Sequence, residues 1–236
     1  MALSREKANF LRFILDELLP PIIRENRYFM YPLCYIWFKG KNVKRFMNFK
    51  SVFHKLNEEE YSSYYEDYDD RGATRKTSAN KKSIEYIINH LSNDKSCSIL
   101  DVGCGKGYIL KQIYDKGYHN LQGMDIVPKS DYDEIKIQQG NVECLPFADQ
   151  SFDIVICTHI LEHVLDLPKA IENLKRVAKD KLIIIVPKQR YYKYTFDLHI
   201  NFFPQASYLL QYLNHPNHKT DIQNIGGDWA VTCDLR

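Results

Sequence analysis

The sequence predicts an α/β fold in which a mostly parallel sheet carries helices on both faces. From about residue 76, short apolar runs typical of buried strands alternate with stretches of helical periodicity, as in a sheet whose parallel strands are joined by helices. Near the end of the chain, two strand-like runs flank Gly226-Gly227-Asp228, which has the composition of a tight turn. An antiparallel hairpin should therefore close one edge of the sheet.

Each element of this fold follows from the local pattern. An amphipathic helix begins near Ser78, because Ile84, Ile87, Ile88 and Leu91 fall on one of its faces. Strands are expected over residues 98–102, 121–126, 134–138, 152–157 and 182–186, helices over 108–116 and 160–178, and hairpin strands over 219–225 and 229–235. This order of elements is Rossmann-like.

The region before residue 76 has a different composition. Residues 28–38 are apolar and aromatic, basic residues follow, and residues 58–70 are acidic and rich in tyrosine. We interpret residues 1–75 as two or three helices that cap the domain formed by residues 76–236 and end in a lid.

The overall composition argues against several classes of function. The chain has 236 residues and a formal net charge of only +2, unlike most basic nucleic-acid binders. Its six cysteines form no CxxC pair, and its first residues do not resemble a secretory signal. Residues 28–38 are too few to span a bilayer, which needs about 20 residues. We therefore expect a cytoplasmic protein that is at most peripheral to a membrane.

The most informative motif is a strand that ends in Gly103-Cys104-Gly105-Lys106-Gly107. Glycines at such a turn allow positive φ and let a ligand approach the main chain, although a purely structural turn is the alternative. Tyr108 stands where a dinucleotide-binding fingerprint needs its last glycine, which disfavours NAD. Asp101, inside the strand, would repel a pyrophosphate and suits an ammonium group.

Two further positions complete a pattern for a nucleoside. Asp125 ends the second strand about 20 residues past the loop, where a carboxylate can accept both hydrogens of a ribose diol. A turn-capping role is the alternative. Asn141 follows the third strand and could hydrogen-bond an adenine edge while Val142 packs on the ring. An amino acid, a ribose and an adenine would then lie in a row.

In these residues the chain resembles the class I S-adenosylmethionine-dependent methyltransferases, in particular a small-molecule branch with quinone and sugar methyltransferases. The resemblance rests on ILDVGCGKGYIL, GMDIV, QGNVECLPFADQSFDIVICTHILEHV and LIIIVP, within residues 78–187. It implies methyl transfer with S-adenosyl-L-methionine as cofactor. Asn141 departs from the aspartate usual at its position. By this resemblance, the methionine end would be lined by Asp101, Gly103, Cys104, Gly105 and Gly107, the ribose and adenine would contact Asp125, Ile126, Asn141 and Val142, and Thr158, His159 and Ile160 would flank the sulfonium.

Methyl transfer to a hydroxyl also requires a base, because the hydroxyl must lose its proton. His199 is the better candidate, because it follows the fifth strand, where this fold places its acceptor pocket, and Asp197 could orient it. A role in holding the loop by hydrogen bonds is the alternative. His163 is a weaker catalytic candidate, because its place beside Leu161 and Val164 suits packing.

A divalent metal held by Glu162, His163 and His199 is a further alternative, since carboxylate and imidazole groups are suitable ligands. Some methyltransferases that this chain resembles in the Glu-His pair use such a metal to polarise a hydroxyl. The favoured interpretation requires no metal.

The acceptor is inferred mainly by elimination. Motifs of methyltransferases that act on nucleobases are absent, which argues for a small molecule such as a sugar, a phenol or a lipid-linked glycan. A non-catalytic S-adenosylmethionine-binding protein, or an enzyme acting on protein or RNA, is the alternative. The expected aromatic pocket comprises Tyr191, Tyr192, Tyr194, Phe196, Phe202 and Phe203.

Residues 28–38 leave two interpretations open. They are flanked by Arg24, Arg27, Lys39 and Lys41, so they could lie in the headgroup region of a membrane. We favour packing as a cap on the sheet, because Pro32 argues against one smooth amphipathic helix.

Overall fold

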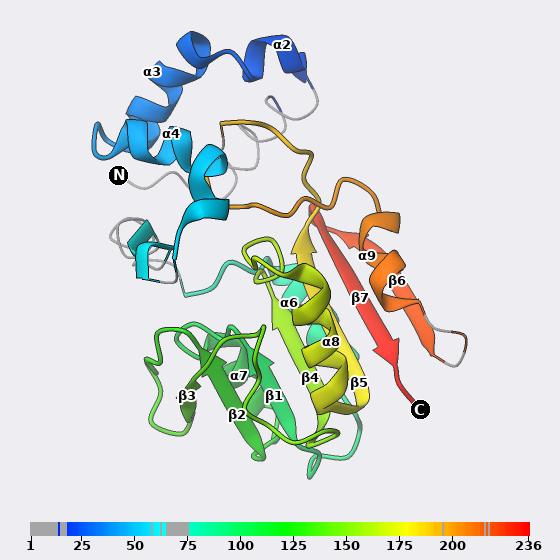
Figure 1. Cartoon of the computed structure of the whole chain (residues 1–236). Helices are drawn as coiled ribbons and strands as arrows, with labels where there is room; N and C mark the ends of the chain where they lie inside the picture. The colour runs from blue at the N-terminus through cyan, green and yellow to red at the C-terminus, as the bar shows by residue number, and fades with distance from the viewer. Residues whose placement is uncertain are drawn as a thin grey trace. The chain divides into compact units, whose positions relative to one another are not determined.

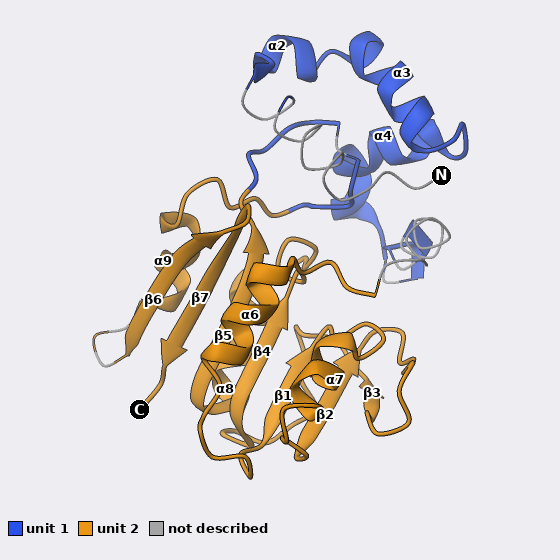
Figure 2. Ribbon diagram, turned by 180° about the vertical axis from the view of Figure 1, so that it is seen from behind, with its two compact units in different colours: residues 1–74, 189–200 blue, residues 75–188, 201–236 orange. Residues whose placement is uncertain are grey.

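A computed structural model describes residues 14, 18–57, 59–61, 63–64, 76–194, 196–214, 216 and 218–236. The chain divides into two compact units, which Figure 2 distinguishes by colour. The smaller unit comprises residues 1–74 and 189–200, and the larger comprises residues 75–188 and 201–236. Residues 189–200, which the sequence pattern assigns to the second domain, thus belong to the smaller unit.

The larger unit is built on a seven-stranded sheet (Figure 1). Its strands are β1 (Ile99–Val102), β2 (Leu121–Asp125), β3 (Ile137–Gln139), β4 (Phe152–Thr158), β5 (Ala178–Pro187), β6 (Lys219–Ile225) and β7 (Asp228–Asp234). Their spatial order is β3-β2-β1-β4-β5-β7-β6. The first five strands are parallel, and β7 runs antiparallel to both β5 and β6. The predicted Rossmann-like sheet with its C-terminal hairpin is confirmed.

Helices pack on both faces of this sheet, because successive side chains of a strand point to opposite faces. The helices α6 (Lys81–Asn89) and α7 (Tyr108–Tyr114) share one apolar cluster with Ile99 and Ile154. The helices α8 (Leu167–Val177) and α9 (Ser207–Leu213) share the other with Leu100 and Val155. Adjacent residues of one strand therefore pack in the clusters on opposite faces of the sheet.

The helix after β4 begins later than the pattern predicts. A helix was expected from residue 160, but α8 begins at Leu167. Asp166 caps it by accepting a hydrogen bond from the Lys169 amide at 3.0 Å, and Pro168 occupies the first turn. Residues 160–166 therefore form turns, and Glu162 and His163 lie in these turns instead of on a helix.

The described part of the smaller unit contains α2 (Pro21–Arg24), α3 (Arg27–Trp37), α4 (Val43–Val52) and a 3-10 turn, η2 (Phe53–Lys55). Residues 189–200 are held to these helices. The Trp37 indole donates a hydrogen bond to the Phe196 carbonyl at 2.9 Å, and their rings lie 5.0 Å apart. The Lys50 ammonium donates to the Tyr192 carbonyl at 2.7 Å.

The helix α3 continues through Pro32, so the expectation that this proline argues against one smooth helix is wrong. The proline lies on the exposed side of α3. There, water can replace the hydrogen bond that proline cannot donate.

Candidate cofactor and active site

The candidate site lies where the strand order of the sheet reverses. The chain moves outward from β1 to β2 and β3, and β4 then returns to the other side of β1. In an open α/β sheet, such a point leaves a crevice at the carboxyl ends of the strands. Val102 pairs with Met124 of β2 and with Cys157 of β4, so the residues that follow these strand ends lie at one edge.

The glycine loop takes the conformation that its residues predict. Gly103, Gly105 and Gly107 all have positive φ. A side chain at Gly103 would meet Ile160 at 2.1 Å, so only glycine allows this approach of the turn after β4. A side chain at Gly105 would meet no atom within 4 Å.

Asp125 lies directly beside this loop. One carboxylate oxygen, Oδ2, accepts a hydrogen bond from the Gly105 amide at 2.8 Å. The other, Oδ1, accepts from the Val127 amide at 3.0 Å. The predicted ribose-binding carboxylate and the glycine loop are therefore joined, and two main-chain amides hold the carboxylate in place.

Asp101 is a buried carboxyl group beneath the loop. It is 1% exposed, and neither side-chain oxygen has a hydrogen-bond partner among the described residues. Burial, with a contribution from the charge of Asp125, raises the pKa of Asp101 to about 8. An acid of this kind calls for a cationic partner, because an isolated buried carboxylate is costly.

The other predicted cofactor residues differ in exposure. Ile126 is 56% exposed directly after β2, as an apolar contact for an adenine requires. Asn141 is exposed, and its side-chain oxygen accepts from the Glu143 amide at 2.9 Å. Val142 is buried within the core. Cys104 packs over Gly123, and burial raises the pKa of its thiol, so it remains neutral.

The turn after β4 contains a buried ionic group. Thr158 is buried, and His159 takes a left-handed conformation with φ 57°. The His159 Nδ1 atom lies 3.2 Å from Glu162 Oε1, and its Nε2 atom lies 3.4 Å from Asp228 Oδ2. Burial alone would lower the pKa of His159, but Asp228 and Glu162 outweigh it and raise the pKa to about 9. The imidazole is therefore a cation at neutral pH.

Sequence reasoning missed the role of Asp228, which looked only like a hairpin-turn residue. Its Oδ2 atom accepts hydrogen bonds from Asn80 Nδ2 at 2.8 Å and from the Ser83 hydroxyl at 2.9 Å. Through His159, this carboxylate connects the start of α6 and the hairpin to the turn after β4. The predicted sulfonium-flanking turn is thus positioned by a residue 69 positions later in the chain.

The predicted base belongs to the smaller unit. His199 is 7% exposed, and its Nδ1 atom lies 2.5 Å from Gln189 Oε1 and 3.4 Å from Asp197 Oδ2. Gln189 donates through Nε2 to the Tyr192 hydroxyl at 2.8 Å. The carboxamide oxygen therefore faces the imidazole, and Nδ1 donates to it. Gln189, which no sequence pattern singled out, is nearer to the imidazole than Asp197.

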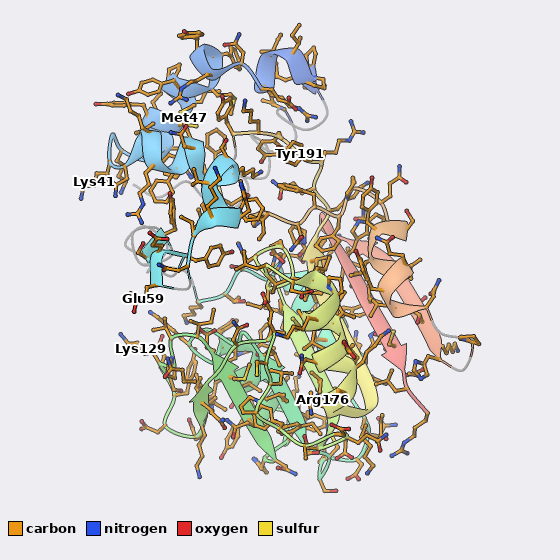
Figure 3. All side chains as sticks on the ribbon, in the orientation of Figure 1. Lys41, Met47, Glu59, Lys129, Arg176 and Tyr191 are labelled. Carbon is orange, nitrogen blue, oxygen red and sulfur yellow. The ribbon has the colours of Figure 1, made fainter. Side chains whose placement is uncertain are left out.

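The remaining predicted residues lie in different units. Tyr192, Tyr194 and Phe196 are buried in the smaller unit, so they are core residues there, whereas Tyr191 is 54% exposed (Figure 3). Glu162 and His163 belong to the larger unit and His199 to the smaller one. The metal alternative stays a prediction.

Comparisons with known proteins show which domain and fold this chain resembles. A methyltransferase-domain family profile matches residues 100–186. A ubiquinone biosynthesis O-methyltransferase of Rickettsia canadensis is 30% identical over 112 residues, which cover 44% of this chain and 47% of that protein. An uncharacterized protein of Methanocaldococcus jannaschii is 34% identical over 109 residues, with coverages of 44% and 47%. This chain spans about half the length of the curated relatives it matches.

A solved structure extends the likeness of the fold beyond the matched domain. It is the 1,6-didemethyltoxoflavin-N1-methyltransferase of Burkholderia thailandensis with bound 1,6-didemethyltoxoflavin and S-adenosylhomocysteine. The TM-score is 0.58 at 16% sequence identity, over 74% of this chain and 86% of that chain. The domain match over residues 100–186, the relatives and the order of the strands support a domain of the class I S-adenosylmethionine-dependent methyltransferase type.

Proposed function

We propose that the larger unit binds S-adenosyl-L-methionine and that the protein transfers its methyl group to a hydroxyl of a small molecule. The observation that carries the proposal is the buried Asp101 carboxyl group, which has no hydrogen-bond partner among the described residues. An ammonium group in the crevice would supply the missing positive charge. The donor set therefore fits the amino-acid end of the cofactor.

The neighbouring residues fit the other parts of the same molecule. The Asp125 carboxylate, already held by two amides, would accept the ribose hydroxyls, and the exposed Ile126 side chain would contact the adenine. The open space at Gly105 allows the ligand to approach the main chain. The cofactor supplies a methyl group on a sulfonium that is already activated, so the protein has mainly to align an acceptor and exclude water.

An oxygen acceptor requires the loss of a proton as the new carbon–oxygen bond forms and the carbon–sulfur bond breaks. We assign His199 as the base that takes this proton, oriented by Gln189 and Asp197. Relatives named as O-methyltransferases support an oxygen acceptor. Within this class, a sugar, a phenol or a lipid-linked glycan remains our proposal.

Methyl-labelled S-adenosylmethionine, incubated with the protein and fractionated cell extract, tests the acceptor class. Label should enter a small-molecule or lipid fraction, and S-adenosylhomocysteine should form in equal amount. Asp125→Ala is the control without a cofactor site. Label in the protein or RNA fraction would refute a small-molecule acceptor, and cofactor binding without turnover in any fraction would indicate a non-catalytic binder.

Alanine substitutions at two glycines test where the cofactor lies. Gly105 and Gly117 both have positive φ, and a methyl group on either would meet no atom within 4 Å, so alanine should destabilise each by about 1–2 kcal/mol through backbone strain alone. Only Gly105 lies at the proposed site. We expect Gly105→Ala to weaken S-adenosylmethionine binding at least tenfold by calorimetry, with Gly117→Ala unchanged. Equal affinities in the two variants would place the cofactor elsewhere.

A further inference from the structure

The exposed side of α3 carries several large apolar side chains. Its side chains cover one continuous side of the helix, because they recur at intervals of three and four residues. Ile22, on the preceding helix, is exposed as well. The exposed fractions are 89% for Tyr28, 41% for Phe29, 38% for Tyr31, 53% for Tyr35 and 72% for Ile36.

Only part of the run that the sequence pattern suggested for membrane contact, residues 28–38, is exposed. Phe38 is only 1% exposed, and Trp37 is held by its hydrogen bond to the Phe196 carbonyl. The opposite side of α3, with Met30 and Cys34, lies in the core of the smaller unit. One side of this apolar run packs in the core of the smaller unit, but core packing does not explain the apolar residues on its exposed side. We call Tyr28, Phe29, Tyr31, Tyr35 and Ile36 together the aromatic face.

From Asn26 onward the charged residues near the aromatic face have one sign, whereas the exposed Glu25 lies just before α3. No acidic residue occurs from residue 26 to residue 57. Lys41 projects from the turn that follows α3 (Figure 3). The exposed cations on α3, on α4 and in the turn between them are Arg27, Lys39, Lys41 and Lys44, and Lys55 follows in η2.

We propose that the aromatic face and the four cations from Arg27 to Lys44 bind the surface of a membrane that contains anionic lipids. Tyrosine and aliphatic side chains favour the boundary between headgroups and acyl chains, and each nearby Lys or Arg adds attraction to anionic headgroups. The charge complementarity favours this occupant over a second copy of the chain, whose identical cations would repel. None of the described helices is long and apolar enough to cross a bilayer, so the helix would lie along the surface.

Vesicle flotation with the full chain tests the proposal. The wild type should float with phosphatidylcholine vesicles that contain about 30% phosphatidylserine and much less with phosphatidylcholine alone. Binding should fall as salt rises from about 0.1 M to about 1 M, because the Debye length shrinks to about 3 Å.

Two double variants separate the apolar and ionic contributions. Tyr28→Ser with Ile36→Ser, and Lys39→Glu with Lys41→Glu, should each lower the vesicle partition coefficient at least tenfold. These side chains are exposed, so circular dichroism should show an unchanged fold. The matched controls on the larger unit, Leu165→Ser with Tyr208→Ser and Lys116→Glu with Lys136→Glu, should float like the wild type.

Three outcomes would overturn the proposal. The wild type could fail to float with anionic vesicles, or both test variants could float as the wild type does. Alternatively, light scattering could show self-association that Tyr28→Ser with Ile36→Ser abolishes, without flotation, and the face would then bind a second copy. None of these readouts requires methyl transfer, so the surface and the catalytic proposal are tested separately.

Discussion

Replacing His199 with alanine should lower turnover by about 10²–10⁴, the range typical of a lost general base. Affinity for S-adenosylmethionine should stay near that of the wild type, because the proposed cofactor residues all belong to the larger unit. Steady-state turnover and calorimetric titration measure the two quantities. A fully active His199→Ala enzyme without metal dependence would refute both the base and the metal alternative.

Gln189 provides a second test of the same assignment. Its oxygen lies 2.5 Å from His199 Nδ1, so Gln189→Glu would place a negative charge there and stabilise the protonated imidazole. The acid limb of the pH–rate profile should then move to higher pH, which a purely structural role would not cause. Inhibition of the wild type by a chelator, reversed by a divalent metal, would instead support metal ligation by Glu162, His163 and His199.

Replacing His159 with glutamine should lower the free energy of unfolding by about 3–5 kcal/mol near neutral pH. Its imidazole is the cation between the buried Glu162 and Asp228 carboxylates, and removing one partner of such a group leaves uncompensated buried charge. At about 2–4 °C per kcal/mol for a domain of this size, the melting temperature should fall by roughly 10 °C. His119→Gln, at an exposed position, is the matched control and should change stability by less than about 0.5 kcal/mol.

The pH dependence of stability gives an independent measurement on His159. Its pKa in the folded protein, about 9, lies above the ordinary value of 6.5, so the folded state holds the proton more tightly. The stabilisation is therefore complete below pH 6.5 and is lost as the pH rises through 9. Denaturant unfolding of the wild type should show this loss, and His159→Gln should not. Equal slopes for the two proteins would show that the ionic group is absent.

The sequence predicted the parts of the fold that depend on local pattern. The apolar strands, the glycine turn and the Gly226-Gly227 hairpin each contain their information within a few residues, and Asp125 follows from its place at the end of β2. The predicted start of α8 was wrong, because apolar periodicity continues through residues 160–166. The Asp166 cap and Pro168 decide where the helix begins.

The long-range contacts could not be predicted in the same way. Asp228 acts on His159 only because β7 inserts between β5 and β6, an order that no local pattern contains. The segment 189–200 follows β5 directly in the chain, but its aromatic residues pack in one cluster with the aromatic side chains of α3 and α4. The periodicity of a sequence does not indicate which distant segments pack together. Gln189 is an uncharged residue in an irregular segment, so its contact with His199 left no signal in the sequence.

The discontinuous smaller unit affects the order in which the chain can fold during synthesis. Its core includes Tyr194, Phe196 and Leu198, so the helices made first cannot complete that core until residue 200 has left the ribosome. At about 5–20 residues per second, this delay is on the order of ten seconds. Throughout that interval the apolar sides of α3 and α4 remain uncovered by their final partners. A fragment that ends near residue 74 would stay in this condition permanently, and it should depend on chaperones or aggregate.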